Sequence, residues 1–350
     1  MLFKELAQEW LQQLDKRLAL NKIKPASVAS FRQRARHAVD GLGELSVEAV
    51  RNGAVKQFAE SLAANHGPKT VRENVLIVKM ILQSHVDRDG EPLFDLSKWR
   101  NNFIFENIED VKDQRRPTIS AEALNAILRN CEIKIMHRVL LTLAAASGMR
   151  IGELLATKVK GDSASTTWDS KVGVIHVRQS LWNGELQKPK TDAAIRQIDL
   201  HDEVNALLAS FIAETKKVSG AFLFSTRKGT PLDPAHVQKY ITAPNGIPGM
   251  HSLRRYRATL AEENGCPRSL LAAWMGHSTE GEGITGRYIK SENKAFRKMW
   301  CQRIGTGLNI VAPIPVLDQA ASEAFDEIFA PLSPAEAELE QMRAGAEALC

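Results

Sequence analysis

The sequence predicts a mainly helical protein with one small antiparallel β-sheet, in which an all-helical domain precedes a mixed α+β domain. Two observations support this fold class. Apolar residues recur at helical spacing over most of the chain, whereas strand-like alternation is confined to the stretch 172–200. The length of 350 residues, of which 44% are hydrophobic and 25% charged, is enough for two domains that each have a core.

The composition favours a globular protein outside the membrane. The longest apolar stretch, Val139 to Ala146, is much shorter than the ~20 residues that a membrane span needs. Lys4 and Glu5 interrupt the apolar residues near the start, which argues against a secretory signal. The four cysteines are far apart, without a Cys-x-x-Cys pair, so disulfides and structural zinc are not expected. We therefore expect a cytoplasmic protein.

The net charge of +5 conceals an uneven distribution. Residues 306–350 contain eight acidic side chains and one basic side chain, which leaves 45 basic and 33 acidic residues in the stretch 1–305, a net charge of +12. Such an excess of basic residues in the stretch 1–305 suits a polyanionic partner such as nucleic acid, although many soluble enzymes are equally basic.

Residues 1–105 are predicted to form the helical domain. Apolar side chains recur at helical spacing, for example at Leu6, Trp10 and Leu14. The polar and charged segment 106–118 is predicted to be a linker between the domains.

The last helix of this domain contains candidate DNA contacts. Thr70 and Glu73 have the spacing of a capping box, which predicts that the helix opens at Thr70. Arg72 and Lys79 lie on one helical face, and Lys69 lies just before the predicted helix. These three cations are candidates for contacts with DNA phosphates, and the alternative is an ordinary solvated face.

Residues 119–305 are predicted to form the mixed domain, with Ser120 as its first N-cap. The predicted elements are helices over 121–128 and 135–146, strands around 172–176, 181–186 and 195–200, and further helices from 203 onward. Asn183-Gly184 is a strong hairpin signal. The Ser/Thr-rich stretch 161–170 is interpreted as a surface insertion.

Four short motifs in this domain contain residues that can bind or cleave a phosphate ester. They read SGMRIGEL, HSLRRY, WMGHS and GRYIK. The candidate residues are Arg150 with Glu153 as its counter-charge, His251 with Arg254 on one helical face, His277, and Tyr288. Each motif alone is weak evidence, because a structural Arg-Glu pair or a solvated His-Arg face would explain it equally well.

In this order, the motifs resemble those of the tyrosine recombinases, the family of the phage integrases, Cre-like enzymes and Xer-type recombinases. That family has an arginine in a Gly-hydrophobic-Arg-x-x-Glu turn, a His-x-x-Arg pair, a Leu-Gly-His motif and a terminal tyrosine. The resemblance spans residues 119–300. It implies that residues 1–105 are the family's core-binding domain and residues 119–305 its catalytic domain.

The resemblance implies a reaction that needs neither a metal ion nor a cofactor. Arg150 and Arg254 would bind the non-bridging phosphate oxygens as planar donor forks. His251 and His277 would donate hydrogen bonds to the same phosphate, and His251 would help to take the tyrosine proton. Tyr288 would attack phosphorus and form a 3′-phosphotyrosyl ester, which conserves the energy of the broken bond.

The family also has a lysine on a β-hairpin, which protonates the departing 5′-oxygen. The segment KPKTDAAIRQIDL resembles this hairpin, with Lys190 before Thr191 and Arg196 further along. Lys190 is the preferred candidate. Lys188, on the same strand face, is the alternative.

The chain has three tyrosines, and Tyr256 is the one serious alternative nucleophile because it directly follows the His-x-x-Arg motif. Tyr240 precedes that motif altogether. Arg255 stands where many relatives have a histidine, and it is a further candidate for a DNA contact.

The resemblance therefore implies a site-specific DNA recombinase of the integrase or excisionase type. Its partners would be double-stranded DNA attachment sites, further copies of itself in a tetramer on DNA, and accessory DNA-bending proteins. Two alternatives are an enzyme similar to the type IB topoisomerases and a DNA-binding protein that keeps the fold without the chemistry.

The acidic tail, residues 306–350, contains a predicted amphipathic helix over 316–329. The resemblance implies that this helix docks on the catalytic domain of the neighbouring protomer. Docking on its own domain, or disorder beyond Pro331, is the alternative.

Overall fold

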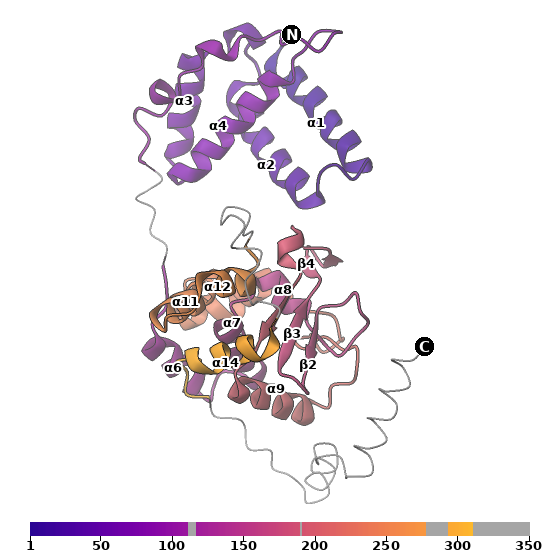
Figure 1. Ribbon diagram of the computed structural model, residues 1–350. Helices are drawn as coiled ribbons and strands as arrows, with labels where there is room; N and C mark the ends of the chain where they lie inside the picture. Colours follow the sequence, from indigo (N-terminus) through magenta and orange to yellow (C-terminus); the bar gives the residue numbers. More distant parts are fainter. Residues whose placement is uncertain (111–116, 190, 278–292, 311–350) are drawn as a thin grey trace, which may run out of the picture. The chain divides into compact units, whose positions relative to one another are not determined.

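The computed structural model (Figure 1) describes residues 1–110, 117–189, 191–277 and 293–310. The chain divides into two compact units, Met1–Arg116 and Pro117–Cys350. The first unit is built from helices, whereas the second contains both helices and strands. No helix in the described ranges is long and apolar enough to cross a membrane.

The first unit is a bundle of long helices followed by a short one. Its α-helices are α1 (Phe3–Ala19), α2 (Pro25–Leu42), α3 (Asn52–Ala63), α4 (Pro68–Gln83) and α5 (Asn101–Ile104). Helix α2 contacts α1, α3 and α4, and the apolar faces meet in one core that includes Phe3, Phe58 and Ile81. This core extends as far as Ile108.

Helix α4 begins at Pro68, earlier than the sequence predicts. Proline suits the first turn because its fixed φ is already helical and its missing N–H has no partner there anyway. Thr70 therefore lies inside the helix, and the predicted capping box is wrong. Glu73 instead forms ion pairs with Arg34 and Lys69.

In the second unit, α7 (Ile135–Ser147) lies between α11 (Met250–Glu263) and α9 (Asp202–Thr215), both of which it contacts (Figure 1). Its residues from Val139 to Ala146 are all buried, because other elements surround the helix. This position explains the longest apolar stretch of the sequence. The other α-helices among the described residues of this unit are α6 (Ala121–Arg129), α8 (Ile151–Leu155), α10 (Pro234–Val237), α12 (Arg268–Met275) and α14 (Lys294–Ile304).

The main sheet is mixed rather than wholly antiparallel. Its strands, in the order in which they pair, are β1 (Lys158–Val159), β2 (Thr167–Asp169), β3 (Val174–Val177) and β6 (Arg196–Asp199). β3 is antiparallel to β2 and β6, whereas β1 runs parallel to β2. Asn183-Gly184, both at positive φ, joins β4 (Ser180–Trp182) to β5 (Glu185–Gln187) in a separate two-stranded sheet.

Residues 165–170 of the Ser/Thr-rich stretch 161–170 belong to the sheet and its core, whereas residues 161–164 are exposed, so the interpretation as a surface insertion is wrong for the second part. Strand β2 runs through it, and Trp168 is 5% exposed, with its indole N–H 2.9 Å from Asn205 Oδ1. The Thr166 hydroxyl accepts hydrogen bonds from the backbone N–H groups of residues 178–179, at 2.9 and 2.7 Å. These polar side chains are buried because each one satisfies a buried backbone or side-chain group.

A buried ion pair connects α14, the last described helix, to the main sheet. Asp199 of β6 and Arg297 of α14 lie 2.8 Å apart, and their side chains are 3% and 7% exposed. The same carboxylate accepts a hydrogen bond of 2.9 Å from the indole N–H of Trp274 in α12. Asp199 thus joins the helices on both sides of the segment 278–292 to one strand.

Replacing Asp199 with Ala is expected to lower the free energy of unfolding of the second unit by about 3–5 kcal/mol, because the change removes the buried carboxylate that binds both Arg297 and Trp274. Urea denaturation with a spectroscopic signal from the second unit measures the loss. Asp202→Ala is the matched control, since it breaks the exposed Asp202–Lys298 pair at the same helix and should cost about 1 kcal/mol or less. Equal losses in the two variants would contradict the prediction.

Candidate active site

A left-handed turn between α7 and α8 places Arg150. Gly148 has φ +65°, a conformation that favours glycine, and a Cβ there would lie 2.7 Å from the Met275 methyl group. Arg150 is the N-cap residue of α8, and its backbone N–H donates to Glu153 Oε2 at 3.0 Å. The junction therefore brings the first predicted arginine to the surface of the core.

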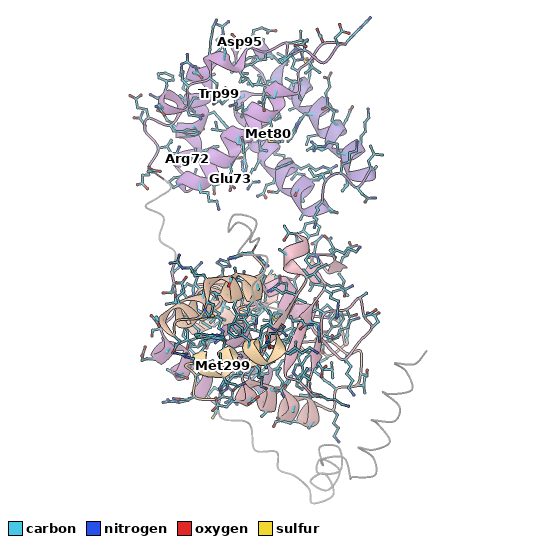
Figure 2. All side chains as sticks on the ribbon, in the orientation of Figure 1. Arg72, Glu73, Met80, Asp95, Trp99 and Met299 are labelled. Carbon is cyan, nitrogen blue, oxygen red and sulfur yellow. The ribbon has the colours of Figure 1, made fainter. Side chains whose placement is uncertain are left out.

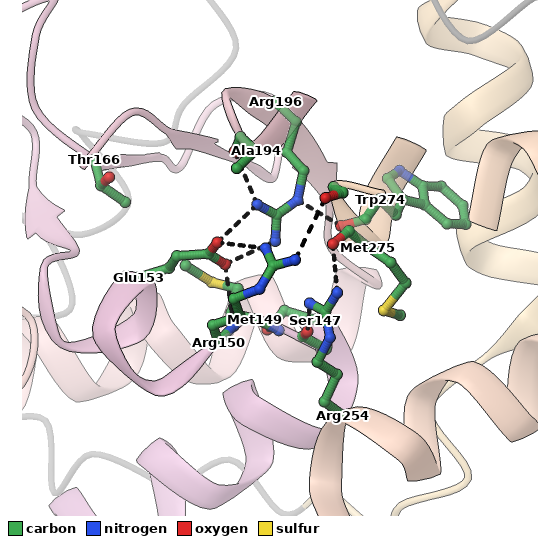
Figure 3. Close-up of polar contacts among 12 residues, drawn as sticks. Ser147, Met149, Arg150, Glu153, Thr166, Ala194, Arg196, Arg254, Trp274 and Met275 are labelled. Carbon is green, nitrogen blue, oxygen red and sulfur yellow. Dashed lines mark hydrogen bonds and ion pairs between the residues drawn. The ribbon is translucent and has the colours of Figure 1, made fainter. Parts of the chain in front are cut away.

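Glu153 is buried and binds two guanidinium groups (Figure 3). Arg150 Nη1 donates to Oε1 at 2.9 Å, and Arg196 donates to Oε1 and Oε2 at 3.1 and 2.8 Å. Burial raises the pKa of this carboxyl, but hydrogen bonding and charge from Arg196, together with Arg150, hold it below the ordinary value. Glu153 is therefore ionised at neutral pH.

Arg254 lies beside this cluster, in the second turn of α11. Its Nη1 donates to the Gly148 carbonyl at 2.7 Å, and its Nη2 donates to the Met275 carbonyl and approaches His277 Nε2 at 3.2 Å. In the described part of the chain, no carboxylate forms an ion pair with it. Burial, followed by the charge of Arg150, lowers the pKa of Arg254 to about 10. The group stays cationic at neutral pH without a full counter-charge.

The end of α12 is where the arginines converge (Figure 3). Three consecutive backbone carbonyls accept a hydrogen bond from three different arginines: Trp274 from Arg196 at 2.6 Å, Met275 from Arg254, and Gly276 from Arg150 at 3.4 Å. The last carbonyls of a helix have no partner within it, so external donors stabilise this end. His277 follows directly and is exposed beside them.

The two predicted histidines lie close enough to these arginines for the positive charges to affect their pKa values. Partial burial lowers the pKa of His277, and the charges of Arg254 and Arg150 lower it further. Burial and nearby charges, including Arg255, Arg254 and Arg150, lower the pKa of His251 in the same way. Both rings are therefore neutral at neutral pH. Because Arg254 can only donate, His277 Nε2 accepts, and the proton of this ring is on Nδ1.

Tyr256 has a structural position. It is 7% exposed, its hydroxyl donates to the Thr306 carbonyl at 2.9 Å, and burial raises its pKa. Tyr240 is 52% exposed and its ring packs against His236. The hydroxyl of Tyr256 is thus committed to holding residues 305–308 on α11, a role unlike that of a nucleophile.

Two predicted catalytic residues, Lys190 and Tyr288, lie outside the described residues, as does the predicted tail helix 316–329. Lys188, the alternative lysine, is exposed. Residues 306–310 of the predicted tail are described. They pack on the second unit, where Leu308 is buried and Asn125 binds both Gly307 and Asn309.

The predicted DNA contacts have partners within their own units. In the first unit, Arg72 stacks on Phe105 at 4.5 Å and donates to the Glu109 carbonyl, and Lys79 lies over Trp99 at 5.9 Å. Figure 2 labels Arg72 and Trp99. Lys69 lies inside α4, with a side chain that is 64% exposed.

In the second unit, Arg255 donates to the Pro117 carbonyl through Nε at 2.9 Å. This contact ties α11 to the first described residue after the segment 111–116. Arg255 therefore has a structural partner in addition to any contact with DNA.

Arg196 is the member of the cluster to which sequence reasoning gave no role. Its position after the KPKT segment marked the hairpin, but its partners, Glu153 and Trp274, are far away in the sequence. The only signal in the sequence was this spacing after Lys190.

A model described as the phage integrase family matches residues 117–294, which is half of the chain and includes the whole cluster. The chain belongs to the phage integrase family. Within this family, the integrase of Staphylococcus phage L54a is 26% identical over 151 residues, which cover 39% of this chain and 43% of that protein. The match thus spans less than half the length of this relative.

Two solved structures have the same fold. The Tn1549 transposon integrase, in complex with transposon right end DNA, matches with a TM-score of 0.62 and 16% identity over 85% of this chain and 98% of that one. A lambda integrase dimer bound to a COC′ core site matches with a TM-score of 0.56 and 16% identity, over 80% and 94% of the two chains. A helical domain followed by a mixed domain, as the sequence predicts, is confirmed.

Proposed function

We propose that this protein is a site-specific DNA recombinase that cleaves and rejoins DNA through a 3′-phosphotyrosyl intermediate. The observation that supports it most is a cluster of three arginines with a single carboxylate, Glu153, which binds Arg150 and Arg196 but not Arg254. His251 and His277 lie at the edge of this cluster. The cluster carries more positive than negative charge. An anionic phosphodiester would complete the charge balance.

In the proposed cleavage step, the Tyr288 oxygen forms a bond to phosphorus and the bond from phosphorus to the 5′-oxygen breaks. His251 accepts the tyrosine proton, and Lys190 donates a proton to the departing oxygen. Arg150, Arg254 and His277 hold the non-bridging oxygens. Rejoining is the reverse reaction with the 5′-hydroxyl of another strand, so no external energy source is needed.

A nicked duplex that contains a candidate attachment site, chosen by a search for direct repeats in the DNA flanking the gene, tests this proposal. Cleavage near the nick releases a short fragment, so a covalent protein-DNA adduct accumulates and survives denaturation. Failure to form an adduct on any flanking repeat would contradict the proposal. Relaxation of supercoiled plasmid without repeats would instead favour the topoisomerase-like alternative.

A 5′-phosphorothiolate substrate distinguishes the two candidate lysines, because its sulfur leaves without a proton donor. The Ala variant of the general acid should cleave this substrate at the wild-type rate and the normal substrate slowly. Lys190 is the expected residue. If the phosphorothiolate substrate restores cleavage by Lys188→Ala and not by Lys190→Ala, the general acid is Lys188.

Lys69, Arg72, Lys79 and Arg255 remain proposed phosphate contacts. If Lys69 contacts DNA, Lys69→Ala should flatten the slope of log affinity against log salt concentration by about 0.9, because one counterion fewer is released. Binding titrations between low and physiological salt measure the slope. Leu20, exposed in the same unit, provides a control through Leu20→Ala, which should leave the slope unchanged. An unchanged slope in Lys69→Ala would show that Lys69 lies on an ordinary solvated face and does not contact DNA.

The proposed partners are double-stranded attachment sites and further copies of the chain in a tetramer on DNA, with accessory DNA-bending proteins as additional candidates. The acidic tail is proposed to dock on the neighbouring protomer. A cytoplasmic location follows from this proposal, since the DNA substrate lies there.

A further inference from the structure

Arg196 has the most complete set of partners in the cluster (Figure 3). Its Nη1 and Nη2 bind the two oxygens of Glu153 at 3.1 and 2.8 Å. Its Nε donates to the Trp274 carbonyl at 2.6 Å, and Nη1 also donates to the Ala194 carbonyl at 2.9 Å. The guanidinium thus donates four hydrogen bonds in one plane, which a lysine at this position could not reproduce.

The two arginines that share Glu153 differ in exposure. The Arg150 side chain is 41% exposed, whereas that of Arg196 is 5% exposed and that of Glu153 is 2% exposed. Only Arg150 can therefore reach a phosphate outside the protein surface. Arg196 faces inward, and its contribution has to act through the groups that it binds.

Arg196 also reaches the end of α12, just before His277. Gly276 has φ +62°, and a Cβ at this position would lie 3.0 Å from Arg196 Nη1 and 3.1 Å from its Cδ. The glycine is therefore needed both for the left-handed turn and for the close approach of Arg196. One side chain thus contacts the Glu153 motif and the Gly-His motif, and its own strand follows the lysine hairpin.

We propose that Arg196 is a positioning residue of the phosphate-binding centre, which neutralises Glu153 so that this carboxylate orients Arg150 without cancelling its charge. When Glu153 binds both Arg150 and Arg196, the three side chains have a net charge of +1, which remains available to the phosphate. If Glu153 bound Arg150 alone, the net charge of this pair would be zero, and the centre would depend on Arg254. This role rests on the proposed recombinase function.

The test compares Arg196→Met and Arg196→Lys with the wild type on the nicked duplex containing the flanking repeats. Arg196→Met should slow adduct formation about 10²-fold, as the loss of a transition-state donor does, and change DNA affinity less than about threefold. Arg196→Lys should recover part of the rate, because it restores the charge without the fork. Arg178→Met, next to the residue paired with Arg196 across the sheet, is the matched control and should retain the rate.

The pH profile separates positioning from a merely structural role. Without Arg196, burial should raise the pKa of Glu153, so that this carboxyl takes up a proton as the pH falls. Cleavage by Arg196→Met should then increase with falling pH over a range in which the wild type is constant, because the protonated carboxyl no longer cancels the charge of Arg150. The step should be absent from the double variant Glu153→Gln/Arg196→Met. His251, His277, Arg150 and Arg254, the other groups around the cluster, are the same in both variants.

Two results would overturn the inference: wild-type cleavage by Arg196→Met, or equal loss in the Met and Lys variants with no new pH-dependent step. Binding of inorganic phosphate to the full chain, followed through the NMR signals of His277, gives a readout without cleavage. Weaker phosphate binding by Arg196→Met supports the positioning role even if the wild type forms no adduct, an outcome that would contradict only the recombinase function. Unchanged phosphate binding would contradict the positioning role.

Discussion

Tyr288→Phe is expected to abolish formation of the covalent protein-DNA adduct, while affinity for the DNA stays close to that of the wild type. Phenylalanine keeps the ring but lacks the hydroxyl that attacks phosphorus, so no phosphotyrosyl ester can form. The measurement is a denaturing gel of the reaction on the nicked duplex, together with a binding titration on the intact duplex.

Tyr256→Phe is the matched control, since it makes the same change in the alternative tyrosine. This variant loses the 2.9 Å hydrogen bond to the Thr306 carbonyl and leaves that buried carbonyl with one partner fewer. We expect a loss of stability of about 1–3 kcal/mol and normal cleavage by the folded protein. A Tyr288→Phe variant that still forms the adduct, or a Tyr256→Phe variant that does not, would reverse the assignment.

The sequence was sufficient to predict the domain order and the main elements, because those follow from local patterns. The apolar run from Val139 to Ala146 fits a central helix, and Asn183-Gly184 fits a two-residue hairpin. The arginine motifs could be located because their spacing reflects turns that the chain makes locally, as between Gly148 and Glu153.

The sequence could not reveal contacts between residues that are far apart along the chain. Arg196 binds Trp274 and Glu153, and Arg297 binds Asp199, across intervals in which no periodicity relates the partners. Strand β2 in the Ser/Thr-rich stretch was missed for a related reason. The polarity of Thr166 suggests a surface loop, and only the structure shows which buried backbone groups its hydroxyl satisfies.

Arg150→Ala and Arg254→Ala are each expected to slow cleavage of the nicked duplex by about 10²-fold or more, with a much smaller effect on DNA affinity. The phosphodiester carries one negative charge, and a second develops on its oxygens as the tyrosine attacks. Guanidinium groups beside these oxygens therefore stabilise the transition state more than the bound substrate.

Arg257→Met is the control for a loss that comes from folding alone. Arg257 lies one helical turn after Arg254 in α11, the two residues are 4% and 5% exposed, and both donate to backbone carbonyls. Only Arg254 also approaches His277, at 3.2 Å. Arg257→Met should lower the melting temperature of the second unit, while the folded fraction should cleave at the wild-type rate.

Single-turnover rates of adduct formation, measured at saturating protein, separate the chemical step from DNA binding. Arg150→Ala has an additional consequence, because Glu153 then keeps Arg196 as its one guanidinium partner and the centre loses its most exposed guanidinium. Cleavage by Arg150→Ala and Arg254→Ala at rates near that of the wild type would show that these arginines only support the end of α12. A selective loss of rate, with binding and folding retained, would place both at the reacting phosphate.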